Sequence, residues 1–361
     1  MSDATTTTTA GETMRAFQVT DWGSPGAYTT VPKPSPGPGQ ILIRMRAAGL
    51  CRSDLDMFAG SAVYRSALTP GFTMGHENAG TVAALGEGVA DLRVGDAVVV
   101  YEMRKCGSCD FCTDGLENYC DRYKSGPIPV TRGVGVDGGL APFLVVPRAE
   151  VVAVGDADPV MLAPLTDAGA VAYHSVLKML PKLKPGTTAA VIGAGGLGWY
   201  GVQLLRALSQ AEVFVVDISE RRLALVEELG VPRKNLIVSD KKALENLREA
   251  TNGRGLDAVV DFVGTDETLQ LCLDVTRTAG RIVVVGMEGG TAKLGWGAIA
   301  SGCDVVFSIG STVQDLKSVC ALAVAGKVRT VIEKFTFDQI QEAYDALKAG
   351  TLTGRAVIVF D

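Results

Sequence analysis

Four cysteines in a short segment constrain this chain more than any other feature of its sequence. They lie in CGSCDFCTDGLENYC, as Cys106, Cys109, Cys112 and Cys120. Four thiolates at gaps of 3, 3 and 8 residues can close one tetrahedral zinc site, and the intervening glycines and polar residues are typical of a surface lobe. Disulfides or free thiols are the alternatives, but cysteines so close in sequence rarely satisfy disulfide geometry. The spacing therefore predicts a structural zinc lobe.

Length and composition exclude several classes of protein. At 361 residues the chain exceeds what one hydrophobic core usually serves. Its 47% hydrophobic and 20% charged residues are typical of a folded α/β protein, and not of a disordered or fibrous one. The net charge of −6 gives no electrostatic footprint for nucleic acid or an anionic membrane. We expect two domains and small-molecule partners, with no nucleic acid and no membrane.

The N-terminal residues predict no targeting signal. Residues 1–13 contain a run of threonines and have neither a basic region nor the apolar stretch of a signal peptide. We expect these residues to form a disordered extension. Because no stretch of 18 apolar residues occurs and half of the eight cysteines lie in one metal-like cluster, a reducing cytoplasm is the expected compartment.

The pattern of strands changes near residue 165. Residues 14–165 show short β-branched runs broken by glycine and proline, which predict an all-β, barrel-like domain. Residues 166–310 alternate strands with helical stretches, which predicts a doubly wound parallel sheet of the dinucleotide-binding type. Residues 311–361 are expected to complete that sheet and return to the first domain.

A glycine-rich turn lies between the first predicted strand and helix of the second half. In VIGAGGLG, Gly193, Gly195 and Gly198 have the spacing of a dinucleotide fingerprint, with Gly196 and Leu197 between them. Such glycines allow a tight turn, close approach of a pyrophosphate and helix-to-strand packing. A crossover turn without a ligand is the alternative. The strand–turn–helix context favours a nucleotide site.

Asp217 ends the next predicted strand, 19 residues beyond the last glycine of the turn. A carboxylate there can accept hydrogen bonds from the adenosine ribose, and its charge would repel a 2′-phosphate, so we expect NAD instead of NADP. Arg222 could neutralise such a phosphate, although a solvated surface charge is the alternative. Val263 and Gly286, beyond later strands, are expected to contact the same cofactor.

The chain has only two histidines. His76 lies in GHENAG beside Glu77, and Cys51 lies in GLCRSD after a strand of the same β domain. A cysteine and a histidine at strand ends can belong to one metal site. His174 lies in an apolar helical pattern and is expected to be a packed helix residue and not a ligand.

Five motifs in order resemble the zinc-dependent medium-chain alcohol dehydrogenases, in particular the bacterial NAD-dependent secondary alcohol dehydrogenases. They are GLCRSD, GHENAG, the four-cysteine segment, PLTDAG and VIGAGGLG, within residues 14–361. The resemblance implies an α/β chain with a GroES-like, β-barrel-type catalytic domain and a Rossmann coenzyme domain. It also implies a homodimer or homotetramer, because the outer strand of the coenzyme sheet commonly pairs with a neighbour in that family.

The resemblance also implies a catalytic zinc held by Cys51, His76 and a third ligand within PLTDAG. Many members have cysteine there, whereas this sequence offers Asp167, which by itself is typical of a helix N-cap. Three protein ligands leave a fourth position for water or an alcohol. Glu77 is expected to be an outer or transient ligand, with a surface carboxylate as the alternative, and Asp54 is expected to orient the imidazole of His76.

Three more residues match functional positions of the family. Ser53 matches the hydroxyl that accepts the substrate proton and passes it toward the nicotinamide ribose. Many relatives continue this relay to a nearby histidine, which is missing here, so Asp56 or water must serve. Arg52 and Arg355 match basic contacts with the cofactor pyrophosphate, and surface charges are the alternative for both.

The expected function is a reversible, NAD-dependent oxidation of alcohols, with one catalytic and one structural zinc per chain. Asp167 favours secondary alcohols. One alternative is a zinc-independent reductase of enones or quinones on the same scaffold. Another is a non-catalytic nucleotide-binding protein. The presence of Cys51, His76 and Ser53 disfavours both.

Overall fold

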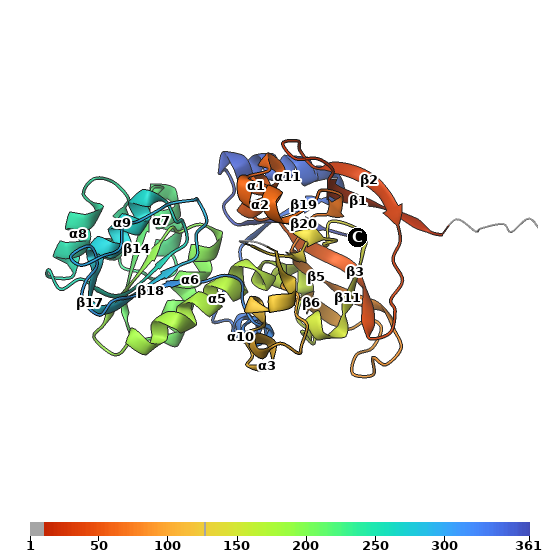
Figure 1. The fold of residues 1–361 in the computed structure, drawn as a ribbon, viewed down its shortest axis with the longest axis horizontal. Coiled ribbons are helices and arrows are strands. Elements are labelled where there is room, and N and C mark those ends of the chain that lie inside the picture. Colours follow the sequence, from red (N-terminus) through yellow and green to blue (C-terminus); the bar gives the residue numbers. More distant parts are fainter. Residues whose placement is uncertain (1–10, 126–127) are drawn as a thin grey trace, which may run out of the picture. The chain divides into compact units, whose positions relative to one another are not determined.

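The computed structural model describes residues 11–125 and 128–361 (Figure 1). The chain forms two compact units, one of Met1–Thr166 with Val331–Asp361 and one of Asp167–Thr330. Residues 311–361 were expected to complete the parallel sheet and return to the first domain, and they contain chain from both units. The last strand of the parallel sheet already ends at Phe307, so the expectation that residues 311–361 complete this sheet is wrong: their strands pair within the first unit. Of the extension predicted for residues 1–13, residues 1–10 lie outside the described residues, and strand β1 already begins at Thr13.

The first unit is built mainly on antiparallel sheets. Its largest sheet has 7 strands, in the order β12-β6-β5-β3-β20-β19, and β11 also pairs with β3. These strands are β3 (Gln40–Gly49), β5 (Glu77–Leu85), β6 (Ala97–Val100), β11 (Phe143–Pro147), β12 (Val151–Ala153), β19 (Ile332–Thr336) and β20 (Arg355–Val359). Because β20 pairs with β3, the C-terminal segment is part of the sheet whose strands β3 and β5 adjoin Cys51 and His76 (Figure 1).

Smaller sheets complete the strands of this unit. They are formed by β1 (Thr13–Val19), β2 (Ala27–Pro32) and β4 (Phe72–Thr73), by β7 (Lys124–Ser125) and β8 (Ile128–Pro129), and by β9 (Thr131–Arg132) and β10 (Gly135–Val136). In β3, the buried Ile43 and Met45 alternate with the exposed Arg44 and Arg46, the period of two expected for a strand. Ile43 and Met45 enter a core shared with β5 and β6.

The first unit also contains short helices and 3₁₀ turns. They are α1 (Arg52–Ala59), α2 (Ala62–Ala67), α3 (Asp110–Thr113), α4 (Pro159–Leu162) and α11 (Ile340–Ala349), with 3₁₀ turns η1 (Glu117–Tyr119), η2 (Asp121–Tyr123), η3 (Arg148–Glu150), η4 (Ala163–Thr166) and η7 (Phe337–Gln339). The C-terminal α11 packs against α1, where Phe58 and Tyr344 meet edge to face at 5.0 Å. Both rings belong to a second hydrophobic core of this unit.

The second unit has a parallel sheet of 6 strands in the order β15-β14-β13-β16-β17-β18. The strands are β13 (Thr188–Ile192), β14 (Glu212–Asp217), β15 (Leu236–Val238), β16 (Leu256–Asp261), β17 (Thr276–Val284) and β18 (Asp304–Phe307). The order reverses between β13 and β16, and ligands of such sheets bind beyond the carboxyl ends of the strands at this point. The predicted doubly wound sheet is confirmed.

Helices alternate with these strands along the chain. They are α5 (Ala168–Met179), α6 (Gly196–Leu208), α7 (Glu220–Glu227), α8 (Ala243–Ala250), α9 (Asp266–Val275) and α10 (Val313–Val324), with turns η5 (Leu180–Lys182) and η6 (Arg233–Asn235). Every residue of β16 is buried, as expected for a parallel strand covered on both faces.

No single helix within the described residues is long and apolar enough to cross a membrane. The two helical segments Pro159–Thr166 and Ala168–Lys182, which meet at a bend of 50°, are together long and apolar enough for a span, as the buried core helices of other proteins also are.

Candidate functional site

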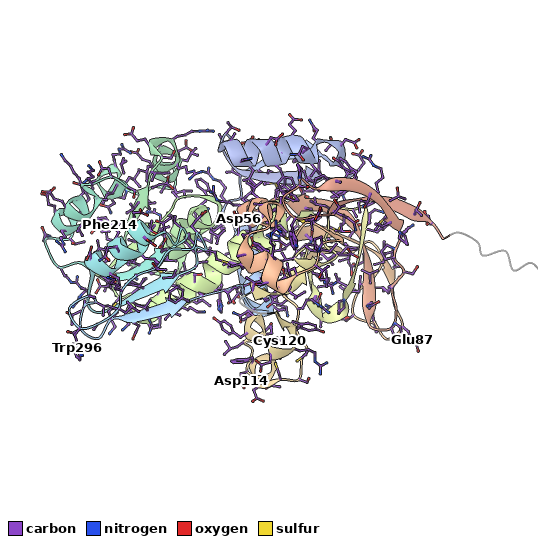
Figure 2. The ribbon with its side chains drawn as sticks, turned by 45° about the horizontal axis from the view of Figure 1, so that its top comes forward. Asp56, Glu87, Asp114, Cys120, Phe214 and Trp296 are labelled. Atoms are coloured by element: carbon purple, nitrogen blue, oxygen red, sulfur yellow. The ribbon has the colours of Figure 1, made fainter. Side chains whose placement is uncertain are left out.

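The four cysteines of the predicted zinc lobe converge on one point. Their Sγ atoms all lie within 4.8 Å of one another, and the pairs Cys106–Cys112 and Cys109–Cys120 are each 3.9 Å apart (Figure 2 labels Cys120). A tetrahedron with Zn–S bonds of about 2.3 Å has edges of about 3.8 Å. A disulfide would need about 2.05 Å, and all four cysteines are free. The lobe has the geometry that the predicted zinc requires.

The lobe supplies its own support for thiolates. The backbone N–H groups of Ser108 and Cys109 lie 3.4 and 3.3 Å from Cys106 Sγ, and the N–H of Cys106 lies 3.3 Å from Cys120 Sγ. Hydrogen bonds from Ser108, and then from Cys109, lower the pKa of the Cys106 thiol to about 5. Burial instead raises the pKa of the Cys112 thiol to about 12. The anionic form that zinc binds is therefore favoured first at Cys106.

A second cluster contains the three residues that the family resemblance assigned to a catalytic metal. Potential ligand atoms of Cys51, His76, Glu77 and Asp167 all lie within 4.8 Å of one another, and all four residues are buried. Cys51 precedes α1, His76 directly precedes β5, and Glu77 is the first residue of β5. A thiolate, an imidazole and a carboxylate are a donor set that zinc accepts.

Asp167 is the residue at which the chain leaves the first unit. It occupies the N-cap position of α5, which is the alternative role that its sequence context indicated. Its side chain makes no capping hydrogen bond with that helix. Its carboxylate also lies within 4.8 Å of the ligand atoms of the other three residues, and its role as a metal ligand stays a prediction.

Asp54 lies beside the imidazole of His76, as expected. Its Oδ1 is 3.3 Å from His76 Nδ1, and its Oδ2 accepts hydrogen bonds of 3.0 Å from the Cys51 backbone N–H and from the Tyr344 hydroxyl. Sequence reasoning missed Tyr344, which is 290 residues from Asp54. The sequence around Tyr344 predicts that it lies on the buried face of a helix, but it gives no sign of a contact with Asp54. Burial, and then the Asp54 carboxylate, raise the pKa of Tyr344 well above its ordinary value, so the hydroxyl remains a donor.

Glu77 forms a buried ion pair with Arg355, the first residue of β20. The pairing of β20 with β3 and of β3 with β5 brings these distant residues together. Gly49 lies opposite Glu77 in the sheet, and a Cβ at Gly49 would overlap the Glu77 side chain. Arg355 was expected to contact a cofactor phosphate. The structure gives it Glu77 as a partner, and the phosphate contact stays a prediction.

The remaining residues expected near the chemistry lie on α1. Ser53 is half-buried in its first turn, whereas Arg52 and Asp56 are exposed. Arg52 and Asp56 line a cavity of about 530 Å³ together with Tyr344. Tyr64 on α2 is buried close to the second cluster. Burial, and then the charge of Cys51, raise the pKa of its hydroxyl, so Tyr64 remains a neutral donor there.

The glycine-rich turn follows β13 and opens α6, as the sequence predicts. Gly193 has φ of 89°, a conformation that favours glycine, and a Cβ at Gly198 would overlap the carbonyl oxygen of Gly193. A Cβ at Gly195 would meet nothing within 4 Å, so the turn leaves open space at the N-terminus of α6. Gly196 and Leu197 are the first two residues of that helix. An anionic group can approach backbone N–H groups there.

Asp217 is anchored beside this turn. Its Oδ2 accepts a hydrogen bond of 2.7 Å from the Ala194 N–H, and its Oδ1 accepts one of 2.8 Å from the Ser219 N–H. Arg222 Nη1 lies 3.8 Å from Oδ2, with a side chain that is 43% exposed. The carboxylate is thus a fixed negative charge next to the space in which a nucleotide could bind.

Asp261 is a second anchor, which sequence reasoning missed. Its buried carboxylate accepts hydrogen bonds from the N–H groups of Val263 and Gly264 and from the Thr268 hydroxyl, at 2.8, 3.1 and 2.8 Å. Its backbone oxygen accepts the N–H of Gly286 at 3.0 Å. One residue therefore holds both loops that were expected to contact the cofactor. The sequence did contain a signal for Asp261, because this carboxylate ends the otherwise largely apolar strand LDAVVD.

His174 lies outside both clusters of candidate ligands. On α5 its Nδ1 is 2.8 Å from Asp315 Oδ2, and its Nε2 is 2.5 Å from Lys178 Nζ. Burial lowers the pKa of Lys178 to about 8. His174 is a packed helix residue, as its sequence context predicts.

Comparison with known proteins adds independent information. Residues 37–156 match the family model described as "Alcohol dehydrogenase GroES-like domain", and residues 196–324 match the one described as "Zinc-binding dehydrogenase". The chain is 32% identical over 357 residues to an "NAD-dependent alcohol dehydrogenase" of Sulfurisphaera tokodaii, which covers 96% of this chain and 100% of the relative.

Two further proteins are similar over nearly their whole length. The chain is 32% identical over 350 residues to a "D-arabinose 1-dehydrogenase (NADP(+))" of Saccharolobus solfataricus, covering 95% of this chain and 97% of the relative. The crystal structure of an alcohol dehydrogenase from Aeropyrum pernix superposes with a TM-score of 0.88 at 30% identity, covering 96% of this chain and 100% of that one. The expected GroES-like first domain and Rossmann-type second domain are thereby confirmed.

Proposed function

The chain belongs to the zinc-dependent medium-chain alcohol dehydrogenase family, and on this premise we propose that it oxidises alcohols reversibly with NAD, secondary alcohols best. The observation that carries the proposal is the buried cluster of Cys51, His76, Glu77 and Asp167. Asp167 as third ligand is the feature behind the preference for secondary alcohols. The products would be ketones, or aldehydes from primary alcohols.

The donor atoms of both clusters fit zinc. Four convergent thiols suit a closed structural site, whereas Cys51, His76 and Asp167 would hold a metal with one position left for substrate. When bound, zinc would supply Lewis acidity toward the substrate oxygen and NAD would accept a hydride. Burial of all four residues of the second cluster would keep bulk water from the reacting atoms.

Ser53 would move the substrate proton. Its hydroxyl follows Cys51 by two residues and lies in the first turn of α1. It would accept the proton of the alcohol and pass it outward, with Asp56 or water as the next acceptor, and would return it in the reverse reaction. Asp56 is exposed on the same helix and can exchange protons with solvent.

Several residues would bind NAD. The turn with Gly193, Gly195 and Gly198, and Gly196 and Leu197 at the start of α6, would face the pyrophosphate. Asp217 would accept hydrogen bonds from the adenosine ribose, and its fixed charge supports NAD over NADP. Val263 and Gly286 would line the cofactor, while Arg52 and Arg355 would contribute positive charge near the phosphates.

The direct test combines activity with metal content. Purified protein is assayed with a panel of secondary and primary alcohols by NADH absorbance, before and after dialysis against a strong chelator, with zinc measured by elemental analysis. We expect two zinc ions per chain and loss of turnover on chelation. Undiminished activity without metal would favour the zinc-independent reductase. No alcohol-dependent NADH formation at all would favour a non-catalytic nucleotide-binding protein.

A second copy of the chain is the expected partner, in a homodimer or homotetramer. β18 is the edge strand of the parallel sheet, and Phe307 on it and Leu294 nearby are 69% and 60% exposed. An exposed apolar sheet edge is suited to pairing with another copy. Light scattering on Phe307→Lys should show a smaller assembly, whereas Val94→Lys, at an equally exposed position of the first unit, should not. Identical masses for both variants would contradict this assignment.

A reducing cytoplasm remains the expected compartment of the protein. Such a compartment would keep the cysteines of both candidate metal sites in the thiol form.

A further inference from the structure

The C-terminal helix α11 contributes a polar group to the surroundings of the second cluster. Tyr344 is 2% exposed, and its ring packs against Phe58 at 5.0 Å and against Phe17 at 6.1 Å. Its hydroxyl donates a hydrogen bond of 3.0 Å to Asp54 Oδ2. A tyrosine in such an apolar environment needs a partner for its hydroxyl, and here that partner is a carboxylate that is itself fully buried.

The hydrogen bonds of Asp54 divide between its two oxygens. Oδ2 accepts both the Tyr344 hydroxyl and the backbone N–H of Cys51, whereas Oδ1 is the oxygen that lies 3.3 Å from His76 Nδ1. Two donors on one oxygen fix the rotation of the carboxylate group. The Asp54 carboxylate thus lies beside the imidazole of His76, and an outer carboxylate of this kind sets the orientation of a metal-bound ring.

We propose that Tyr344 is a positioning residue, which holds the Asp54 carboxylate so that it orients His76 as a metal ligand. The aromatic ring of Tyr344 would serve the core with or without its oxygen, so the oxygen is the part of the side chain that this role needs. The inference rests on the proposed metal-binding role of Cys51, His76 and Asp167. It adds a contribution from α11, which is far from these ligands in sequence.

The role also explains why a polar atom is retained in this core. The Tyr344 ring belongs to a hydrophobic core that also contains the apolar side chains of Phe17, Phe58 and Ile340. Phenylalanine would pack as well there and would need no hydrogen bond. Outer-shell partners of metal-bound histidine typically affect metal affinity by about 10- to 100-fold, so loss of this hydroxyl should be measurable.

The test is Tyr344→Phe in the full-length, zinc-loaded protein, followed by zinc release to a chromogenic chelator. We expect two phases in the wild type, one for each cluster. In the variant the phase of the second cluster should be about tenfold faster, and the phase of the four-cysteine lobe unchanged. Protein with cobalt(II) at the second cluster should show a shifted visible spectrum, because that spectrum reports ligand geometry.

Tyr200→Phe is the matched control. Tyr200 is also fully buried and donates a hydrogen bond, at 3.3 Å to Thr330 Oγ1, but within the second unit. The Tyr200→Phe variant should leave both phases of zinc release and the cobalt spectrum unchanged. If Tyr344 acts through Asp54, then Tyr344→Phe should change release by less than about twofold in an Asp54→Asn background.

The outcomes separate the two proposals. Unchanged release and cobalt spectrum in Tyr344→Phe, with two zinc ions still bound per chain, would overturn the role of Tyr344 and leave the proposed function intact. Equal effects of Tyr344→Phe in the wild-type and Asp54→Asn backgrounds would also overturn it. A wild-type protein that binds zinc only in the four-cysteine lobe would overturn both proposals.

Discussion

The two clusters of candidate metal ligands are constructed in opposite ways. The four-cysteine lobe takes all its ligands from one short segment, and donors of that same segment hydrogen-bond to its sulfur atoms. The second cluster takes Cys51, His76 and Asp167 from separate segments, and further segments supply Tyr344 and Arg355. The four-cysteine site is closed and local, and a metal bound there would stabilise the lobe itself. The second site would keep one coordination position for substrate, and its ligands are held in place by several distant segments of the fold.

The ligand types of the two clusters also differ, and this difference again indicates a structural site in the lobe and a catalytic site in the second cluster. Four thiolates around zinc leave no position for substrate and carry excess negative charge, which suits a structural role. A thiolate, an imidazole and a carboxylate balance the charge of the ion more closely and permit a fourth ligand. The following variants test this division, starting with the largest expected effect.

Cys51→Ser should separate the two clusters most clearly. We expect it to lose one of two zinc ions and to lower kcat for secondary alcohols by about 10³-fold or more, since removing even one electrostatic stabiliser costs about 10²–10³. Elemental analysis and NADH absorbance check this. Cys303→Ser is the control, because Cys303 belongs to neither cluster. Full zinc content together with near-normal kcat would contradict the catalytic assignment.

Cys112→Ser should have the complementary effect on stability. Losing a structural metal should lower the free energy of unfolding by about 3 kcal/mol, which is large for one substitution. The protein that remains folded should keep most of its kcat, because the second cluster has its own supports. Urea unfolding with parallel activity and zinc measurements checks this. The division between the two sites would fail if kcat fell as far as in Cys51→Ser.

Asp217→Ala tests a third site, the candidate nucleotide site. This site combines the local glycine-rich turn after β13 with the carboxylate of Asp217 at the end of β14. Removing the fixed carboxylate should shift the ratio of kcat/KM for NAD over NADP by about 30-fold toward NADP, equivalent to about 2 kcal/mol. Steady-state kinetics with both cofactors measures this ratio. Asp240→Ala, which removes an acidic residue of the same unit, should not change it. An unaltered ratio in Asp217→Ala would show that the assignment of Asp217 is wrong.

The sequence by itself predicted the four-cysteine lobe, the glycine-rich turn, Asp217 and the doubly wound sheet. In each case the signal is local, because a few residues at fixed spacing are enough to specify a turn, a cap or the alternation of strands and helices. The resemblance to a family added Asp167 as a candidate ligand, where the residues alone indicated a helix cap.

Only the tertiary structure brought Asp167 to Cys51 and His76, paired Glu77 with Arg355, and gave Asp54 its hydrogen bond from Tyr344. These contacts join segments up to 290 residues apart. The contact of Glu77 with Arg355 depends on the pairing of β20 with β3, and that of Asp54 with Tyr344 depends on the packing of α11 against α1. Local propensity determines which segments become strands and helices, but it does not determine which distant strands pair, and that pairing decides which charges meet in the interior.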